Sequence, residues 1–579
     1  MQKKESIFPV IYGLLMPRIL TRQKSTNSCT HSVRNKKLGM NFHPRYLQRQ
    51  GGFMHNGYFL GVDVGSASVR AGVYSASGHR LAFATAPVSQ FRPGGERVEQ
   101  SSAEIWQQVC KTVKEATALA GIPISAIRSL GFDATCSLVV LDEQGQGLAV
   151  SSGGSANHDI IMWMDHRATV ETAQINAMKD PALRYVGGEV SVEMELPKLR
   201  WLKTHLPQTW QAAHRFFDLA DFLVWKATGR DVAGLCTLTC KWNYLAHEQR
   251  FSHSLLESID LTDMLERIPA DILPPGAAVG TLTATAAEEL GLTTNVIVAS
   301  GLIDAHAGGV ALAGAHPSVT LALISGTSNC HMLCSEKEIF TPGVWGPYWS
   351  AMLPNYWLTE GGQSAAGALV EWTLQESGAS ANLFHKAQQR GCHPIQLINE
   401  WVAALEANES EPTRNLHVLA DHHGNRSPRA RPDARGSVYG LTLERGENQL
   451  ARLYLATLQA IAFGTRHIIE TLRENGHTIT RLTLCGGATH NPLWLREYAD
   501  VTGCDIHLMQ EEDAVTLGAA ISGAVASGAW GDFTSACKAM VEAGEIIQVN
   551  PQRREFLERK YRVYLTLWEQ QQAVNQLMQ

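Results

Sequence analysis

Residues 61–74 read GVDVGSASVRAGVY, an apolar strand that carries an aspartate and then turns at Gly-Ser-Ala-Ser. An ordinary hairpin needs only a turn residue, whereas this one sets the Asp63 carboxylate beside Gly65. The hydroxyls of Ser66 and Ser68 follow, in a turn whose backbone N–H groups can face an anion. The stretch fits a phosphate-binding hairpin, and an ordinary hairpin remains the alternative on local grounds.

A second candidate lies in GLIDAHAGG, residues 301–309, where Asp304 ends the apolar strand VIVASGLID. A partly desolvated carboxylate at a strand end suits a general base that takes a proton from a hydroxyl. Asp304 could equally cap a helix over residues 305–310. His306 is expected to be packed in the core, because no second His or Cys stands at metal-binding spacing.

The opening pattern returns later in the chain. From Val319, VTLALISGTSNCHMLCS repeats the order of strand, Gly-hydroxyl turn and strand, and Gly326 follows Gly65 by 261 positions. A repeat at this spacing predicts two domains of one design that offer their hairpins to a shared cleft. Chance similarity of two Gly-Ser hairpins is the alternative.

A third candidate is a diglycine, Gly486-Gly487, at the end of the strand ITRLTLCGG. Asn491-Pro492 follows, which is an expected N-cap and first-turn pair for a helix. A helix N-terminus directly after a diglycine can receive a nucleotide, and an ordinary strand-to-helix connection is the other interpretation.

Alternation of apolar residues, helix caps and turn residues predict the elements that position these candidates. The predicted elements are strands over 58–74 and 81–87, a helix over 101–120, a strand pair over 128–142 closed by DEQG, a helix over 361–372, a loop over 421–436 and a helix over 449–474. Strands followed by helices and more strands indicate an α/β fold in layers.

The bulk composition excludes several classes of protein. With 579 residues, 45% hydrophobic residues and a formal charge of -6, the chain is expected to be a globular protein that does not bind nucleic acid. No apolar run is long enough to span a membrane. The eleven cysteines form no CxxC pair, so we expect thiols in a reducing compartment and a cytoplasmic protein.

The N-terminus differs in charge from the rest. Residues 1–53 hold ten Lys and Arg against one acidic residue, Glu5, and show little periodicity. We interpret residues 1–55 as a basic extension outside the fold. It is either a targeting segment or an upstream extension of a protein that starts at Met54.

Taken together, these stretches resemble the FGGY carbohydrate kinases, which share an actin-like (ribonuclease H-like) ATPase fold of two duplicated domains with an interdomain cleft. The resemblance covers about residues 58–570. GVDVGSASVR resembles the first phosphate motif, SGTSN the second, LCGGATHNPLW the adenosine motif and GLIDAHAG the segment of the catalytic base. It implies a sugar-binding domain over 56–305 and a nucleotide-binding domain over 306–575.

The resemblance implies ATP and Mg²⁺ as cofactors, with Asp304 as the base that deprotonates a sugar hydroxyl and Asp63 as the carboxylate that holds the metal. The implied ATP-binding residues are Gly65, Ser66, Ser68, Arg70, Gly326, Thr327 and Ser328 at the phosphates and Gly486, Gly487 and Asn491 at the adenosine. No P-loop motif is present, as this fold would lead one to expect.

The implied sugar-binding residues point to one branch of the family. TCSLV, with Thr135, Cys136 and Ser137, resembles the sugar-binding motif of the D-ribulokinases. The other implied sugar contacts are Lys241, Glu360, Trp163, Asp165 and Arg167. Outside the resemblance, a tryptophan such as Trp163 is more often core and a lysine such as Lys241 more often a surface charge.

The resulting hypothesis is an ATP-dependent kinase that converts D-ribulose to D-ribulose 5-phosphate. Its small-molecule partner is the sugar, with no membrane or nucleic-acid partner, and a homodimer is possible. The same chemistry on D-xylulose, L-ribulose or ribitol is the nearest alternative. A non-catalytic ATP switch of the actin-like fold is the alternative from another class.

Overall fold

A computed structural model describes residues 57–577 of the chain. The basic extension predicted for residues 1–55, with both interpretations of it, lies outside the described residues. The described residues form two lobes, each built on a large mixed sheet.

The first lobe is built on a mixed sheet in the order β13-β14-β5-β1-β2-β3, with β15 also paired to β5. Its strands are β1 (Tyr58–Val64), β2 (Ser68–Ser75), β3 (Arg80–Pro87), β5 (Ile127–Ala134), β13 (Ala278–Thr281), β14 (Ile297–Ala299) and β15 (Leu302–Ile303). The predicted hairpin is confirmed, since β1 and β2 pair antiparallel as far as Val64 and Val69. β5 runs parallel to β1 on its other side.

The second lobe repeats this arrangement in the sheet β18-β19-β17-β16-β22-β23-β24. Its strands are β16 (Thr320–Ser325), β17 (Asn329–Ser335), β18 (Trp345–Trp349), β19 (Trp357–Gln363), β22 (Arg481–Cys485), β23 (Ile506–Met509) and β24 (Ala543–Ile547). β16 and β17 form an antiparallel hairpin, and β22 runs parallel to β16 as β5 does to β1. The predicted repeat of one design is therefore confirmed by the strand order.

The strand pair predicted over 128–142 is wrong in its pairing. β5 belongs to the first sheet, whereas β6 joins a separate small sheet in the order β4-β7-β6-β8, and residues 135–137 connect the two sheets. Alternation of apolar residues indicates a strand but does not show which other strand it pairs with. The smaller sheets are made by β4 (Glu99–Gln100), β6 (Leu138–Leu141), β7 (Ile160–Ile161), β8 (Arg215–Asp218), β9 (Val232–Gly234), β10 (Tyr244–Leu245), β11 (Arg250–Phe251), β12 (Asp271–Leu273), β20 (His417–Leu419) and β21 (Ser437–Tyr439).

Two of the three predicted helices are confirmed. The helix predicted over 101–120 is α1, which Ser101 caps by accepting the Glu104 N–H and which ends at a left-handed Gly121. The helix predicted over 449–474 is α13, with its apolar face buried. The first-lobe helices are α1 (Ser102–Ala120), α2 (Thr169–Ala177), α3 (Glu195–His205), α4 (Pro207–Ala212), α5 (Leu219–Thr228), α6 (Leu235–Lys241), α7 (His253–Ser258), α8 (Ala284–Leu290) and α9 (Asp304–Ala313).

The helix predicted over 361–372 is wrong in its first half. Gly361 and Gly362 are the last part of β19, where they pair with His331 and Cys330 of β17, and the helix begins only at Gly367. The ladder of β17 supplies hydrogen bonds that local sequence does not reveal. The remaining helices are α10 (Gly367–Gln375), α11 (Ser380–Arg390), α12 (Pro394–Asn408), α13 (Glu447–Glu474), α14 (Pro492–Thr502), α15 (Ala514–Ala526), α16 (Phe533–Met540) and α17 (Arg554–Leu577).

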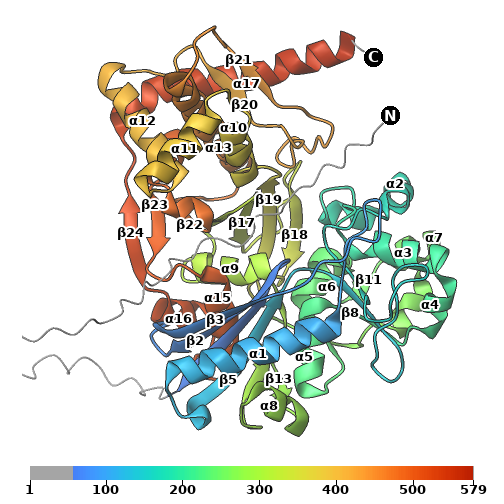
Figure 1. Cartoon of the computed structure of the whole chain (residues 1–579). Coiled ribbons are helices and arrows are strands. Elements are labelled where there is room, and N and C mark those ends of the chain that lie inside the picture. Colours follow the sequence, from blue (N-terminus) through green and yellow to red (C-terminus); the bar gives the residue numbers. More distant parts are fainter. Residues whose placement is uncertain (1–56, 578–579) are drawn as a thin grey trace, which may run out of the picture. The chain divides into compact units, whose positions relative to one another are not determined.

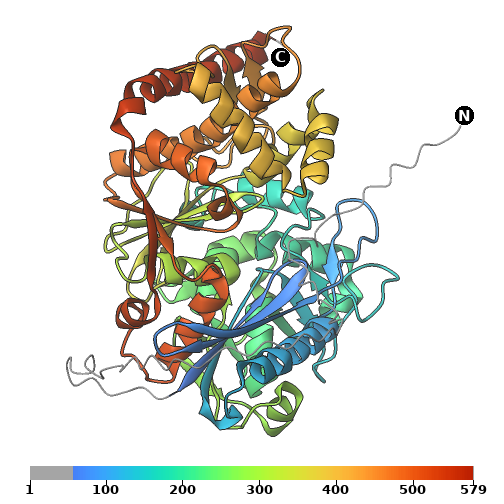
Figure 2. The ribbon, with the colours of Figure 1, turned by 60° about the vertical axis from the view of Figure 1, so that its left-hand side comes forward.

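Helices α9 and α15 lie between the two sheets (Figure 1), with α15 packed on β1 and β5 and α9 packed on β16. Figure 2 shows the orange-red α15 segment beside the blue strands of the first lobe. The approach is close because glycines form it. A Cβ atom on Gly61 would lie 1.9 Å from the Thr516 carbonyl oxygen, and one on Gly518 would lie 1.8 Å from that of Ala307.

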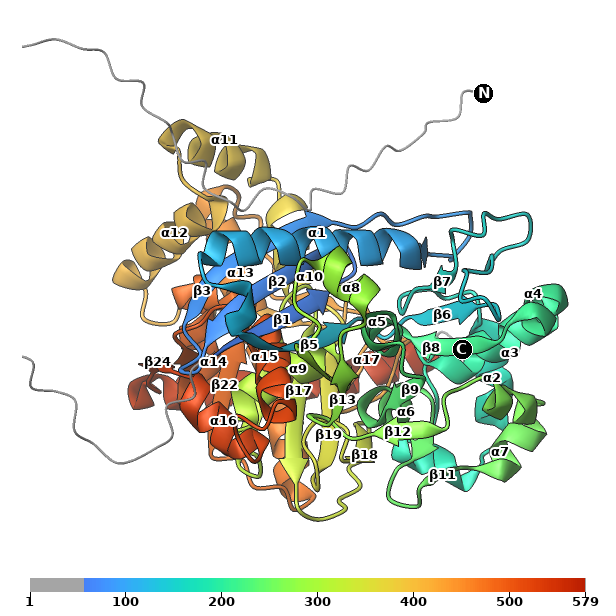
Figure 3. The same ribbon diagram turned by 90° about the horizontal axis from the view of Figure 1, so that it is seen from below.

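The opposite face of the first sheet is covered by α1, which packs on β2 and β3 and crosses them in Figure 3. Both faces of the hairpin that carries Asp63 are therefore covered by helices. Among residues 57–577 no helix is long and apolar enough to cross a bilayer. The cysteines described there are all free thiols.

Gly61→Ala is expected to destabilise the fold, because a methyl group there meets the backbone of α15 and neither element can yield freely. We expect a loss of about 1–3 kcal/mol in the free energy of unfolding, measured by urea denaturation. Gly378→Ala is the matched control, since a Cβ there has no atom within 4 Å. Equal losses in both variants would contradict the assigned contact.

Candidate active site

The turn of the first hairpin is closed by its own backbone. The Gly65 N–H donates to the Ser68 carbonyl at 3.0 Å, so this N–H is not available to a ligand. The Ser66 hydroxyl accepts the indole N–H of Trp163 at 2.9 Å. Gly65, Ser66 and Ser68 are only half-buried. Because the Ser66 hydroxyl only accepts there, its O–H remains able to donate, so the turn offers an anion its remaining N–H groups and the hydroxyls of Ser66 and Ser68.

The second hairpin has the same construction. The Gly326 N–H donates to the Ser328 carbonyl at 2.9 Å, and Gly326 and Thr327 are exposed. A Cβ on Gly326 would meet nothing closer than 4.0 Å, and its φ is not left-handed. The glycine is therefore not required by the turn geometry but leaves the backbone open to close approach by a ligand.

The diglycine lies directly against this second turn. Gly486 has a φ of 91°, and a Cβ there would lie 2.5 Å from the Ser325 carbonyl oxygen. Gly487 is exposed. The predicted cap is confirmed, because the Asn491 side chain accepts the Trp494 N–H.

The Asn491 amide is buried and already engaged. It donates to the Tyr454 hydroxyl at 2.8 Å and accepts from the Asn399 amide at 3.0 Å. Asn491 therefore holds α14 and its neighbours in place, while the exposed Gly487 forms the surface at this point.

Buried carboxyls gather at the ends of the first-lobe strands. Asp63 is fully buried and pairs with Arg70, whose Nη1 also contacts Asp513 of α15 at 2.9 Å. Burial raises the pKa of the Asp63 carboxyl, and Arg70 opposes that shift. Arg70 thus joins a strand of the first lobe to the N-cap of a helix of the second.

Asp133 is a member of this cluster that the sequence analysis missed. It stands beside Asp63 in the parallel register of β5 and β1, and it is fully buried. Burial raises the pKa of Asp133 well above the usual range, and the negative charge of Asp63 is the second cause. Both carboxyl oxygens of Asp133 and Oδ1 of Asp63 receive no donor from another described residue, and a proton on Asp133 would be shared with Asp63.

These unpaired oxygens fit a hard cation such as Mg²⁺, which takes one or two carboxylates and completes its shell with water and phosphate. Residues 57–577 contain no group of three or more His, Cys, Asp or Glu side chains placed to hold a metal by themselves. Two carboxylates alone therefore suit a metal ion that binds together with a phosphate group, which supplies further ligands. Asp63 and Asp133 are the residues that would hold it.

Asp304 begins α9, and its carboxylate accepts the N–H of Ala305 at 2.7 Å. Asp304 as a residue is half-buried. Desolvation is the main cause that raises the pKa of Asp304 to about 7, and the negative charge of Asp63 is the second. The alternative role of helix cap is wrong, because α9 begins at Asp304 with Ile303 as its N-cap and no side chain caps it. The raised pKa suits a general base.

Lys241 is buried rather than a surface charge. Its side chain comes from the end of α6, and its ammonium makes no hydrogen bond among the described residues, while Nζ lies 5.0 Å from the centre of the Trp345 ring. Burial would lower the pKa of Lys241, but the surrounding Cys136 and Glu360 raise it. A buried cation without an acceptor implies a ligand that supplies one.

Glu360 of β19 faces this lysine from the second lobe. Burial alone would raise the pKa of its carboxyl, but the charges of Lys241 and the contact with His306 hold it well below the usual range. Arg426 donates to Oε1 at 3.1 Å, and His306 Nε2 lies 3.5 Å from Oε2. His306 is packed, as expected, since it is 1% exposed.

The TCSLV residues connect the two first-lobe sheets beside this cluster. The Thr135 N–H donates to the Val64 carbonyl at 3.0 Å, and the Ser137 hydroxyl accepts the Trp163 N–H at 3.1 Å. Burial raises the pKa of the Cys136 thiol to about 12, against the influence of Lys241. The segment is thus a buried wall next to Lys241.

Asp165 and Arg167 lie in an ion network of their own. Arg167 contacts Asp165 at 2.7 Å and Glu99 at 2.8 Å, and all three side chains are almost fully buried. Its guanidinium also lies 4.9 Å from the Trp201 ring. These two residues therefore hold the segment that carries Trp163, and Trp163 is half-buried against the first hairpin turn.

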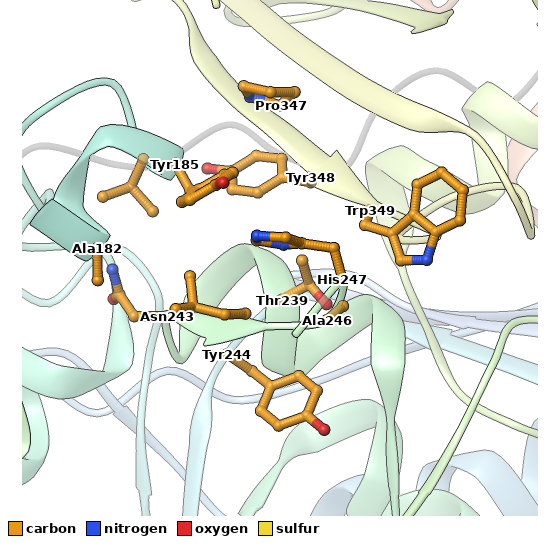
Figure 4. A pocket seen from close by; sticks show the side chains of 12 residues that line it. Ala182, Tyr185, Thr239, Asn243, Tyr244, Ala246, His247, Pro347, Tyr348 and Trp349 are labelled. Atoms are coloured by element: carbon orange, nitrogen blue, oxygen red, sulfur yellow. The ribbon is translucent and has the colours of Figure 1, made fainter. Parts of the chain in front are cut away.

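A small recess with room for about one water molecule lies between α6 and β10 of the first lobe and β18 of the second. Figure 4 shows Tyr185, Thr239, Asn243, His247 and Tyr348 around it. The Thr239 hydroxyl, the Asn243 amide and the Tyr348 hydroxyl are buried without a hydrogen-bond partner among the described residues. Such groups are normally paired, so the recess suits bound water or ligand hydroxyls.

Comparison with known proteins agrees with this architecture. Residues 58–311 match the N-terminal domain, and residues 321–527 the C-terminal domain, of the FGGY family of carbohydrate kinases. The chain belongs to that family. The domain boundary expected at residue 305 falls within α9, and the two matches leave residues 312–320 between them.

The chain is similar to an FGGY carbohydrate kinase domain-containing protein of Danio rerio, with 44% identity over 91% of this chain and 100% of the relative. A D-ribulokinase of Saccharomyces cerevisiae is 36% identical over 81% of this chain and 72% of its own. The xylulose kinase structure from Rhodospirillum rubrum has a TM-score of 0.73 at 23% identity, covering 89% and 99% of the two chains, and shares the fold.

The raised pKa of Asp304 predicts a pH-dependent stability difference. A carboxyl with a pKa of about 7 in the folded protein and its ordinary value of 3.8 when unfolded favours folding when protonated, so its contribution is lost as pH rises between these values. The Asp304→Asn variant has no carboxyl at this position, so it does not lose this contribution to stability as pH rises. The melting temperature of the variant relative to wild type is expected to increase from pH 5 to pH 8, and a constant difference would contradict the shift.

Proposed function

We propose that the protein transfers the γ-phosphoryl group of ATP to the 5-hydroxyl of D-ribulose, giving D-ribulose 5-phosphate and ADP. The observation that carries the proposal is the Asp304 carboxyl, whose pKa is raised to about 7 and whose surroundings include the charges of Asp63 and Lys241. The choice of acceptor is supported by the similarity to a D-ribulokinase.

Asp304 accepts the proton of the 5-hydroxyl while the oxygen attacks the γ-phosphorus. The new P–O bond forms as the bond from the γ-phosphorus to the β–γ bridging oxygen breaks, and ADP leaves with that oxygen. A base with a pKa near 7 is half ionised at neutral pH and still strong enough to take the proton.

The two hairpin turns hold the phosphates. Backbone N–H groups of the turns and the hydroxyls of Ser66, Ser68 and Ser328 donate to phosphoryl oxygens, and Arg70 adds a positive charge. Mg²⁺, when bound, neutralises charge on those oxygens. Asp63 and Asp133 would hold it, while Gly486 and Gly487 border the adenosine.

The sugar binds between the lobes. Lys241 and Glu360 hydrogen-bond its hydroxyls and carbonyl, and the segment of Thr135, Cys136 and Ser137 forms the wall. Such polar recognition rejects a stereoisomer that leaves a buried group unpaired. Trp163 supports the first turn, and Asp165 and Arg167 position the Trp163 segment without touching the sugar.

Another pentulose is the second candidate acceptor. Relatives named ribulokinase are about 30% identical, and solved xylulose kinases share the fold. We expect a kcat/KM for D-ribulose at least about tenfold above those for L-ribulose, D-xylulose and ribitol, which corresponds to about 1.4 kcal/mol. Coupled ADP release measures it. Preference for another pentulose would keep the kinase and discard TCSLV as the marker of its substrate.

Asp304→Asn is expected to lower kcat by about 10³-fold, because the amide keeps the shape but cannot accept the proton. The affinity for the sugar, measured by calorimetry, is expected to change less than about threefold. Asp271→Asn, at an exposed ion pair, is the control and should retain full activity. An Asp304→Asn enzyme that keeps most of its turnover would overturn the assigned base.

A further inference from the structure

Arg426 belongs to the loop predicted over residues 421–436. The loop is closely held. Asn425 and Arg431 exchange two backbone hydrogen bonds of 2.9 and 2.8 Å, and the Asn425 amide donates to Asp421 at 2.8 Å. The start of the Arg426 side chain crosses Gly362, where a Cβ would lie 2.9 Å from Arg426 Cδ. The absence of a side chain at Gly362 lets the arginine reach the sugar site.

At its tip, Arg426 enters the cluster of Lys241 and Glu360. Its guanidinium carbon lies 4.2 Å from the centre of the Trp345 ring, which Lys241 also approaches. Nη2 donates to Glu360, and among residues 57–577 this is the one hydrogen bond the guanidinium makes. Arginine has five N–H donors, so most of its hydrogen-bonding capacity is unused.

The charges around this point favour a neutral ligand. Burial raises the pKa of the nearby Cys330 thiol to about 11, and the charges of Arg426, Glu360, Asp304 and Lys241 all act on that thiol. With Asp304 ionised as the base, two cations and two carboxylates balance. An acidic sugar would add an uncompensated negative charge.

Most of the unused groups are donors. Arg426 and His306 each take one acceptor position of Glu360, whereas the ammonium of Lys241 and the guanidinium of Arg426 retain a larger number of free N–H groups. A carbonyl oxygen only accepts hydrogen bonds, whereas a hydroxyl also has a proton that needs an acceptor. An end with more donors than acceptors therefore suits a carbonyl beside the hydroxyls that Glu360 can accept.

The chemistry of the substrate requires a carbonyl here. A 2-pentulose closes its five-membered ring through the 5-hydroxyl, so a molecule whose 5-hydroxyl is free to react is in the open-chain form with a free carbonyl. We propose that Arg426, together with Lys241, binds this carbonyl oxygen and thereby makes the enzyme prefer open-chain pentuloses to the corresponding pentitols. The proposal rests on the proposed function and adds a specificity residue to it.

The test compares D-ribulose with ribitol, which has a free 5-hydroxyl and no carbonyl. In Arg426→Gln, kcat/KM for D-ribulose is expected to fall at least about tenfold, whereas that for ribitol should change less than about threefold. Arg426→Lys, which keeps charge and donors, should recover part of the loss. Arg431→Gln is the matched control, since Arg431 pairs with Asp433 at the surface of the same loop.

Binding gives a second readout that needs no turnover. In the Asp304→Asn background, calorimetry is expected to show that Arg426→Gln reduces the ratio of D-ribulose to ribitol affinity at least about tenfold. An unchanged ratio, or equal losses for both ligands with a lowered melting temperature, would overturn the proposal. Failure of the wild-type enzyme to phosphorylate any pentulose or pentitol would instead refute the proposed function.

Discussion

The backbone contact of α15 with β1, β5 and α9 is the constraint on which the site depends. It is possible only because Gly61, Gly131 and Gly518 have no side chain, so that carbonyl oxygens of one element stand where a Cβ would be. A helix of the second lobe is thereby fixed on the strand that carries Asp63. Arg70 can then reach Asp513 at the start of that helix, which places an ion pair from both lobes beside the phosphate turn.

Around this contact the protein leaves several buried polar groups unpaired. The oxygens of Asp133 are taken out of water without receiving a donor from the described residues, and the buried Lys241 makes no hydrogen bond with them. Such groups cost free energy in the empty site, and a metal or a sugar oxygen recovers it on binding. A substrate that supplies the missing partners is therefore favoured over one of the same size that does not.

The strands, hairpin turns and helix caps near the site could be predicted because their signals are local. Ser101 with Gly121, Asn491 with Pro492, and the two Gly-Ser turns each carry their signal within a few residues. Which strands pair with one another could not be predicted from such local signals. β5 and β6 are adjacent in sequence but belong to different sheets, and Gly361 extends a strand whose partner lies about thirty positions away.

The same distinction between local signals and long-range pairing applies to the residues of the candidate site. Asp133 ends an apolar strand as Asp63 does, so its signal was present, but only the parallel register of β1 and β5 shows that the two carboxyls are neighbours. Arg426 has no periodic or motif signal, because its role depends on a loop that crosses a glycine of another strand.

Both ends of the reaction centre are assembled from the two lobes. Asp63 and Arg70 meet Asp513 at the proposed phosphate end, and Arg426 meets Glu360 near Lys241 at the proposed sugar end. Neither set is complete in one lobe alone, so separation of the lobes would disassemble both. A sugar that bridges Lys241 and Arg426 therefore also favours the arrangement that holds the phosphate turns together. Coupling of this kind limits transfer of the phosphoryl group to water, because the turns are brought together when the acceptor is in place.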